Sequence, residues 1–136
     1  MKNLLRIFLI ESPGPIDLLQ NRTEVKALEE ICLILGFEAK RFFLNSNVEL
    51  VNYINYISSI FEFLNEGDNI PLCIHISAHG NDNGLSFGND FIEWKSFLTI
   101  VQPILKKANE YTKDIIFVFS ACGAGRQKMR LAGMMH

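Results

Sequence analysis

The sequence predicts an α/β protein: a three-layer sandwich with a mostly parallel sheet of about four strands and helices on both faces. The predicted strands are residues 4–10, 37–44, 71–79 and 114–120, and segments with helical periodicity separate them. Residues 4–10 and 115–119 are continuous apolar runs, which are typical of strands buried on both faces. The β-α-β order requires right-handed crossovers, which place helices against both faces of the sheet.

The first half of the chain contains two strands, each followed by a helix. The first strand ends at residues 12–15, where Ser-Pro-Gly-Pro indicates a loop. The first helix ends at Gly36, a typical C-cap residue. Its apolar face comprises Leu28, Ile31, Cys32 and Leu35. Ser46 and Glu49 form a capping-box pattern that starts the second helix, and Gly67 ends it. Its buried stripe is expected to comprise Leu50, Ile54, Ile57, Phe61 and Leu64.

The second half adds a strand, a small hairpin, a helix and the last strand. The third strand runs from Pro71 to His79. Residues 81–84, Asn-Asp-Asn-Gly, indicate a turn, and residues 85–87 return as a hairpin arm. The third helix is expected to kink or break near Pro103. Its apolar face comprises Trp94, Phe97, Leu98, Val101, Leu105 and Ala108.

Composition excludes several classes of protein. The chain of 136 residues forms one domain, residues 1–136, and 49% hydrophobic with 21% charged residues argues against disorder. A net charge of −2 without a basic run argues against a nucleic-acid partner, and no stretch approaches transmembrane length. Three cysteines without a C-x-x-C pair indicate a reducing, cytoplasmic location. Cys73 and His75 supply only two of the four ligands of structural zinc, so neither metal nor cofactor is expected.

Two short matching segments carry most of the functional information. Residues 77–80 read Ser-Ala-His-Gly, residues 120–123 read Ser-Ala-Cys-Gly, and each segment follows a predicted buried strand. If these strands are parallel neighbours, both segments emerge at the same edge of the sheet. That arrangement brings the imidazole of His79 beside the thiol of Cys122, which is the layout of a cysteine nucleophile and its acid/base partner.

Cys122 has two interpretations. It is either a nucleophile or a small residue at a tight turn between a strand and a helix. Residues 123–125, Gly-Ala-Gly, have no large side chains, which favours a solvent-accessible thiol at Cys122. A helical turn starting near Arg126 would lower the pKa of this thiol. Cys32 and Cys73 lie on an apolar helix face and inside a strand, so both are predicted to be core residues.

The predicted chemistry is acyl transfer to the Cys122 thiolate. The N–H groups of Gly80 and Cys122 would hold the developing oxyanion, and each such donor lowers the barrier by about 3 kcal/mol. His79 would protonate the leaving amine, after which water releases the acyl group.

These residues resemble the clan CD cysteine peptidases, which include caspases, metacaspases and the bacterial CHAT peptidases. Residues 79–88 are similar to the caspase histidine loop and its hairpin, and residues 120–123 are similar to the CHAT cysteine segment. Residues 35–40 resemble the caspase stretch between the first helix and the second strand. The resemblance extends from residue 4 to about residue 125 and implies a caspase-like fold with strand order 2-1-3-4.

By this resemblance, His79 and Cys122 are the catalytic dyad, Gly80 and Cys122 provide the oxyanion N–H groups, and the substrate is a protein or peptide. The family's substrate preference depends partly on the loop after the first strand. Glu11 lies there and could receive a basic side chain, and Arg22 resembles the arginine by which caspases hold aspartate. The alternative for both residues is a solvated surface charge.

Only 14 residues follow Cys122, whereas these peptidases normally continue with further strands and helices. The chain is therefore expected to be a truncated catalytic core, a subunit that needs another chain, or a non-catalytic relic. Residues 115–119 would then form an apolar sheet edge of the kind that proteins avoid exposing. We expect a second copy, a partner chain or the C-terminal tail to cover this edge.

Three functions are compatible with these features of the sequence. The first is a cysteine endopeptidase of caspase-like fold. The second is a non-catalytic caspase-like module for assembly or recognition. The third is a flavodoxin-like receiver or small-ligand domain, which is disfavoured because the third strand ends in Ser-Ala-His-Gly rather than in a phosphorylated aspartate.

Overall fold

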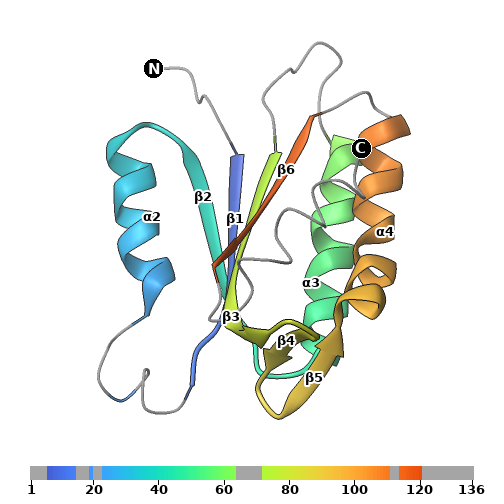
Figure 1. Ribbon diagram of the computed structural model, residues 1–136. Helices are drawn as coiled ribbons and strands as arrows, with labels where there is room; N and C mark the ends of the chain where they lie inside the picture. Colours follow the sequence, from blue (N-terminus) through green and yellow to red (C-terminus); the bar gives the residue numbers. More distant parts are fainter. Residues whose placement is uncertain (1–5, 15–18, 20–22, 64–71, 111–113, 121–136) are drawn as a thin grey trace.

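The computed structural model describes residues 6–14, 19, 23–63, 72–110 and 114–120 (Figure 1). These residues alternate strands and helices along the chain. In order, the elements are β1 (Arg6–Ser12), α2 (Glu24–Ile34), β2 (Glu38–Phe43), α3 (Asn47–Ile60), a 3-10 turn (Phe61–Phe63), β3 (Leu72–Asn81), β4 (Gly84–Phe87), β5 (Asp90–Glu93), α4 (Trp94–Glu110) and β6 (Ile115–Ser120).

Four strands form a parallel unit in the order β2-β1-β3-β6. Counted as predicted strands, this is the order 2-1-3-4, which is confirmed. Helix α2 covers one face of the sheet, and α3 and α4 cover the other (Figure 1). The α/β class and the helices on both faces are therefore confirmed.

The sheet as a whole is mixed, which corrects the expectation of a mostly parallel sheet. Strand β3 continues beyond the parallel unit, and its last residues, from His79 to Asn81, pair antiparallel with β4. Strand β4 in turn pairs antiparallel with β5. The physical reason is the tight turn at Asp82 and Asn83, which sends the chain back along β3 before α4 begins. The predicted hairpin thus extends the sheet.

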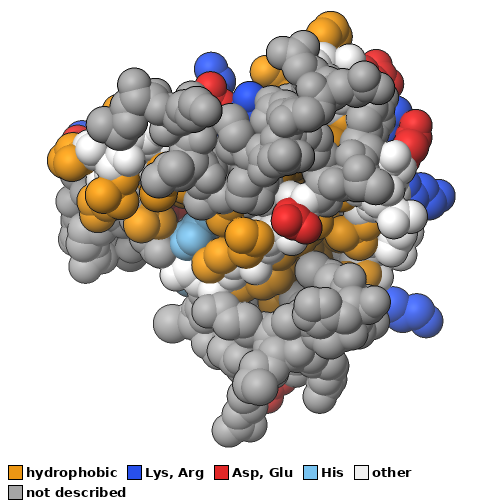
Figure 2. Space-filling view, turned by 90° about the horizontal axis from the view of Figure 1, so that it is seen from above, with side chains coloured by type: hydrophobic (Ala, Val, Ile, Leu, Met, Phe, Trp, Pro, Cys, Tyr) orange, Lys and Arg blue, Asp and Glu red, His pale blue; other side chains and the backbone are white. Residues whose placement is uncertain are grey.

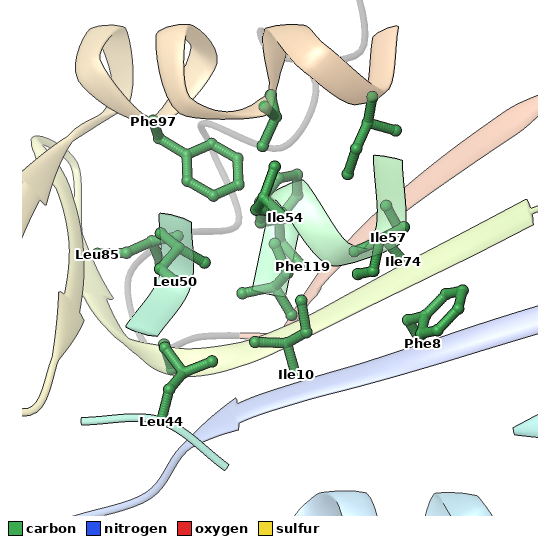
Figure 3. Close-up of a cluster of buried hydrophobic side chains, with 14 of the residues drawn as sticks. Phe8, Ile10, Leu44, Leu50, Ile54, Ile57, Ile74, Leu85, Phe97 and Phe119 are labelled. Carbon is green, nitrogen blue, oxygen red and sulfur yellow. The ribbon is translucent and has the colours of Figure 1, made fainter. Parts of the chain in front are cut away.

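The main hydrophobic core lies between the sheet and the pair α3 and α4 (Figure 3). Apolar side chains from one face of each strand meet the inner faces of both helices. In Figure 3, Phe97 extends from α4 toward the strands, where Phe119 and Ile10 lie. A smaller cluster lies under α2 and comprises Ile7, Leu9, Val25, Cys32 and Cys73.

Helix α3 starts at the predicted capping box. The Oγ of Ser46 accepts a hydrogen bond from the N–H of Glu49 at 3.2 Å, and Oε1 of Glu49 accepts from the N–H of Asn45 at 3.3 Å. The first bond satisfies an N–H group that a helix start leaves unpaired, and the second ties Glu49 to the residue before the N-cap Ser46. The predicted stripe is confirmed at Leu50, Ile54, Ile57 and Phe61, all of which are buried. Leu64 and Gly67 lie outside the described residues.

A kink or break was expected near Pro103, and helix α4 continues through this residue, so there is no break. A proline removes one intrahelical N–H, and the buried residues on both sides of Pro103 hold the two parts against the same core. These buried residues are Phe97, Val101, Ile104 and Ala108. The carbonyl oxygen of Pro103 accepts a hydrogen bond from Oγ of Ser58 on α3 at 3.4 Å. Ile104 was missing from the predicted apolar face.

The predicted buried face of α2 is only partly correct. Cys32 is buried, but Ile31 and Leu35 are 51% and 54% exposed. Helix α2 packs on the sheet through the buried residues Val25 and Cys32. Ile31 and Leu35 lie on the flank away from the Glu29–Arg41 ion pair, which measures 3.5 Å. Among the described helices, none packs beside that flank. Figure 2 shows hydrophobic side chains gathered at the left, on the side of α2.

Strand β6 lies at an edge of the parallel unit. Among the described strands it pairs only with β3, and Ile116 is 46% exposed. None of the helices in the described ranges is long and apolar enough to cross a membrane.

Candidate functional site

The candidate site lies where β3 leaves the parallel unit. Ser77 pairs with Ser120 of β6, and Ala78 pairs with Ser12 of β1. From His79 onward, β3 pairs with β4 instead. His79 therefore lies at the carboxyl edge of the parallel strands, with an exposed side chain.

The chain changes direction at this edge. Strand β1 is followed by α2 on one face, whereas β3 is followed by the β4–β5 hairpin and by α4 on the other face (Figure 1). Neighbouring strands whose connections lead to opposite faces leave a crevice at their carboxyl ends. Such crevices are where open α/β sheets bind ligands. The position of His79 thus matches a usual binding position of this architecture.

A pocket of about 330 Å³ lies beside His79. Three segments that are distant in sequence surround it: the chain after β1, the connection between β2 and α3, and the β4–β5 hairpin. The described residues that line it are Pro13, Gly14, Asn45, His79, Ser86, Gly88 and Asn89. A second pocket of about 290 Å³, with Arg6, Lys40 and Tyr56 in its wall, contains none of the predicted site residues.

Hydrogen bonds tie the walls of the His79 pocket together. The Oγ of Ser12, at the end of β1, accepts a hydrogen bond from the N–H of Gly88 at 2.9 Å. The Oδ2 of Asp90, in β5, accepts from the N–H of Asn47 at the start of α3 at 2.8 Å. The hairpin is therefore attached to both β1 and α3.

Gly88 allows the hairpin to approach the β2–α3 connection. Its φ is +64°, a conformation that side-chain-bearing residues rarely adopt, and an added Cβ would overlap the carbonyl oxygen of Asn45. We expect Gly88→Ala to lower the free energy of unfolding by about 1–3 kcal/mol. Urea denaturation measures this change, and Asn89→Ala, in the same turn, is the control. Equal stability of the two variants would show that the turn adapts without strain.

Glu11 lies at the end of β1 and is 5% exposed, so the alternative of a solvated surface charge is wrong for it. Its Oε1 accepts a hydrogen bond from the N–H of Val25 in the first turn of α2 at 2.9 Å. The N-cap residue Thr23 makes no side-chain capping bond, so Glu11 provides this interaction from the sheet. The contact of Glu11 with a basic substrate group stays a prediction. In the structure, the Glu11 carboxylate already accepts a hydrogen bond from the start of α2.

Two predicted site residues, Cys122 and Arg22, lie outside the described residues. The segment that carries Cys122 is described as far as Ser120, which pairs with Ser77. Gly80 is described and pairs with Leu85 of β4. The structure thus brings together the two strands that precede the predicted dyad, and the pairing of imidazole and thiol stays a prediction.

Cys32 and Cys73 are buried thiols, as predicted. Burial raises the pKa of the Cys73 thiol to about 11, with a further contribution from Cys32. Burial, followed by the charge of Glu29, also raises the pKa of Cys32. Because the thiolate is the nucleophile, neither cysteine is suited to nucleophilic chemistry at neutral pH.

His75 is half-buried in β3, between Leu9 of β1 and Val118 of β6. Within the part of the chain that the structure describes, no group of three or more His, Cys, Asp or Glu residues could hold a metal ion. His75 is therefore treated as a residue of the sheet.

Sequence reasoning missed most of the pocket wall. Asn45, Ser86 and Asn89 come from two separate connections, and only the pairing of strands and the Gly88 contact bring them together. The local signals were the capping box after Asn45, the turn after Asn81 and the resemblance of residues 79–88 to the caspase histidine loop, which includes Ser86. None of these signals assigned a binding role to Asn45, Ser86 or Asn89. No protein-family model matches the chain, and a search of curated proteins finds no similar sequence.

Proposed function

We propose that the protein is a cysteine endopeptidase of caspase-like fold that cleaves peptide bonds with a dyad of His79 and Cys122. The observation that carries the proposal is the pairing of Ser77 with Ser120 at neighbouring strand ends. His79 and Cys122 each follow the paired serine by two positions. Neighbouring strands lie about 5 Å apart, so a thiol that continued the β6 register would be within reach of the imidazole.

The position of His79 fits a general acid and base. Its side chain is exposed and lines a pocket, so a peptide can reach it from solvent. In the first half-reaction, the Cys122 thiolate bonds to the substrate carbonyl carbon, and protonated His79 donates its proton to the leaving amine as the C–N bond breaks. In the second, water attacks the thioester, His79 accepts the water proton, and the C–S bond breaks to release the acid.

Gly80 suits the proposed oxyanion role. The hairpin closes at Asn81 and Gly84 across a two-residue turn, and opposite residues in an antiparallel pair alternate between hydrogen-bonded and non-hydrogen-bonded positions. Counting back one position from the closing pair gives Gly80 and Leu85 the non-hydrogen-bonded position. The Gly80 N–H then points away from β4, where an oxyanion could accept its hydrogen bond.

Alkylation of the intact chain tests the nucleophile. With iodoacetamide at pH 7, we expect Cys122 to react at least tenfold faster than Cys32 and Cys73, because burial keeps the latter two protonated and covered. Peptide mass spectrometry gives the three rates separately, and Cys122→Ser shows which signal belongs to which site. Equally slow labelling of all three cysteines would favour a non-catalytic module for assembly or recognition.

We also propose that the outer edge of β6 pairs with a strand from another chain, and the first candidate is a second copy of this protein. Ile115–Ser120 carries five apolar residues at a strand edge without a charged residue or proline, a composition that favours pairing with another strand. We expect the protein to be a dimer by light scattering and Ile116→Lys to shift it to monomer. Val48→Lys, on the exposed surface of α3, is the matched control. A monomeric unmodified protein would contradict pairing through β6.

A further inference from the structure

Apart from His79, the described residues that line the pocket are uncharged, and several of them carry groups that form hydrogen bonds. They include Asn45 and Asn89, which carry carboxamides, and Ser86, which carries a hydroxyl. Together they offer both donors and acceptors. The pocket therefore has the chemistry to bind an uncharged polar side chain.

Two carboxylates near the pocket are engaged by helix N-termini. Oε1 of Glu11 accepts from the N–H of Val25 in α2, and Oδ2 of Asp90 accepts from the N–H of Asn47 in α3. Negative charge is favoured at helix N-termini, where the backbone N–H groups and the helix dipole stabilise it. Both carboxylates thus have structural roles and are held by the helices that flank the pocket.

A carboxamide matches the described lining better than a charged side chain does. A lysine or arginine side chain would lose water on entering, and the described lining has no carboxylate to replace that water. An aspartate or glutamate would find only His79 in the described lining, and the proposed mechanism gives the proton of His79 to the leaving amine. A carboxamide has a carbonyl acceptor and an NH₂ donor, and the groups of Asn45, Ser86 and Asn89 can pair with both.

The size of the pocket is also suitable. A volume of about 330 Å³ is at the lower end of the range for small-molecule sites. It accommodates one side chain of the size of asparagine or glutamine together with the adjoining backbone. Because His79 lies in the wall, a side chain bound here belongs to a residue beside the bond that reacts.

We propose that the protein cleaves next to an asparagine or glutamine whose carboxamide binds Asn45, Ser86 and Asn89. This specificity rests on the proposed peptidase function, since it concerns the same site. It assigns Asn45 and Asn89 as specificity-determining residues, which the sequence motifs did not indicate.

The test uses the full chain and a set of fluorogenic peptides that differ only in the residue before the cut. The informative pairs are Asn against Asp and Gln against Glu, which differ in charge but hardly in size. We expect kcat/KM to be at least tenfold higher for each amide than for its acid, and also higher than for Lys, Arg and Leu. A preference for any charged or apolar residue overturns the specificity.

Asn89→Asp provides a second test because it adds a carboxylate to the pocket. We expect it to lower kcat/KM for the Asn and Gln peptides at least tenfold and to raise that for the Lys and Arg peptides. Asn55→Asp makes the same change on the exposed surface of α3 and is expected to leave the preference unchanged. If Asn89→Asp leaves the preference unchanged as well, Asn89 does not contact the substrate and the assignment is wrong.

The two proposals fail in different ways. Cleavage with another preference overturns the specificity but leaves the peptidase function standing. If no peptide is cleaved and Cys122 shows no selective alkylation, the peptidase function fails and the specificity fails with it.

Discussion

Replacement of His79 by alanine is expected to lower kcat/KM for peptide cleavage by about 10²–10⁴-fold. A positioned general acid and base typically contributes a factor of this size, and alanine has no proton to transfer. The fold should persist, because the His79 side chain is exposed and belongs to neither hydrophobic cluster. Steady-state kinetics with the fluorogenic peptides measures the loss, and circular dichroism checks the fold.

The chain provides a matched control for this experiment in His75. It lies on the same strand, four residues earlier, and is half-buried among strand neighbours. His75→Gln removes an imidazole from β3 at a site away from the pocket lining and should retain most of the activity. If the His75 and His79 variants lose activity equally, or if His79→Ala keeps full activity, the proposed dyad is wrong.

The second large effect concerns stability. Phe97→Ala is expected to lower the free energy of unfolding by about 3–5 kcal/mol, because the truncation leaves a cavity in the core. Phe97 is fully buried on α4, and its ring lies 5.5 Å from that of Phe119 and 6.4 Å from that of Trp94, centroid to centroid. The edge-to-face contact with Phe119 joins α4 to β6, the strand that precedes the candidate nucleophile, and the contact with Trp94 lies within α4. Urea denaturation gives the change.

Phe63→Ala is the control, since it makes the same substitution at a side chain that is 81% exposed. Surface substitutions of this kind usually change stability by less than about 0.5 kcal/mol. A loss for Phe97→Ala no larger than that for Phe63→Ala would show that the cluster in Figure 3 is not a tightly packed core.

Several elements were predictable because their signals are local. The interaction between Ser46 and Glu49 spans three residues, so the start of α3 follows from the sequence around it. The apolar runs of β1 and β6 are too short for typical helices and lack polar alternation, which predicts strands. Burial is confirmed for β1, whereas in β6 only Phe119 is buried because β6 lies at an edge. The turn after Asn81 likewise depends on neighbouring residues, with Oδ1 of Asn81 accepting hydrogen bonds from the N–H groups of Asn83 and Gly84.

Other features depend on contacts between distant segments. The side chains of Ile31 and Leu35 fit an apolar helix face, yet they are exposed because α2 packs on the sheet through its buried residues Val25 and Cys32 instead. Glu11 looked like a loop charge, yet it is buried because the start of α2 supplies an N–H fourteen residues later in the chain. Periodicity cannot indicate either outcome, since each depends on which neighbour packs against the residue.

The strands, the helix start and the position of His79 at a strand end thus follow from short-range patterns in the chain, because hydrogen-bonding and steric preferences act between residues a few positions apart. The pocket beside His79 was decided by tertiary structure alone. Its wall combines Gly14, Asn45 and Asn89, which come together because β1, β2 and β3 pair and because Gly88 admits the close approach of the hairpin. The proposed substrate selection would therefore depend on packing between segments more than thirty residues apart.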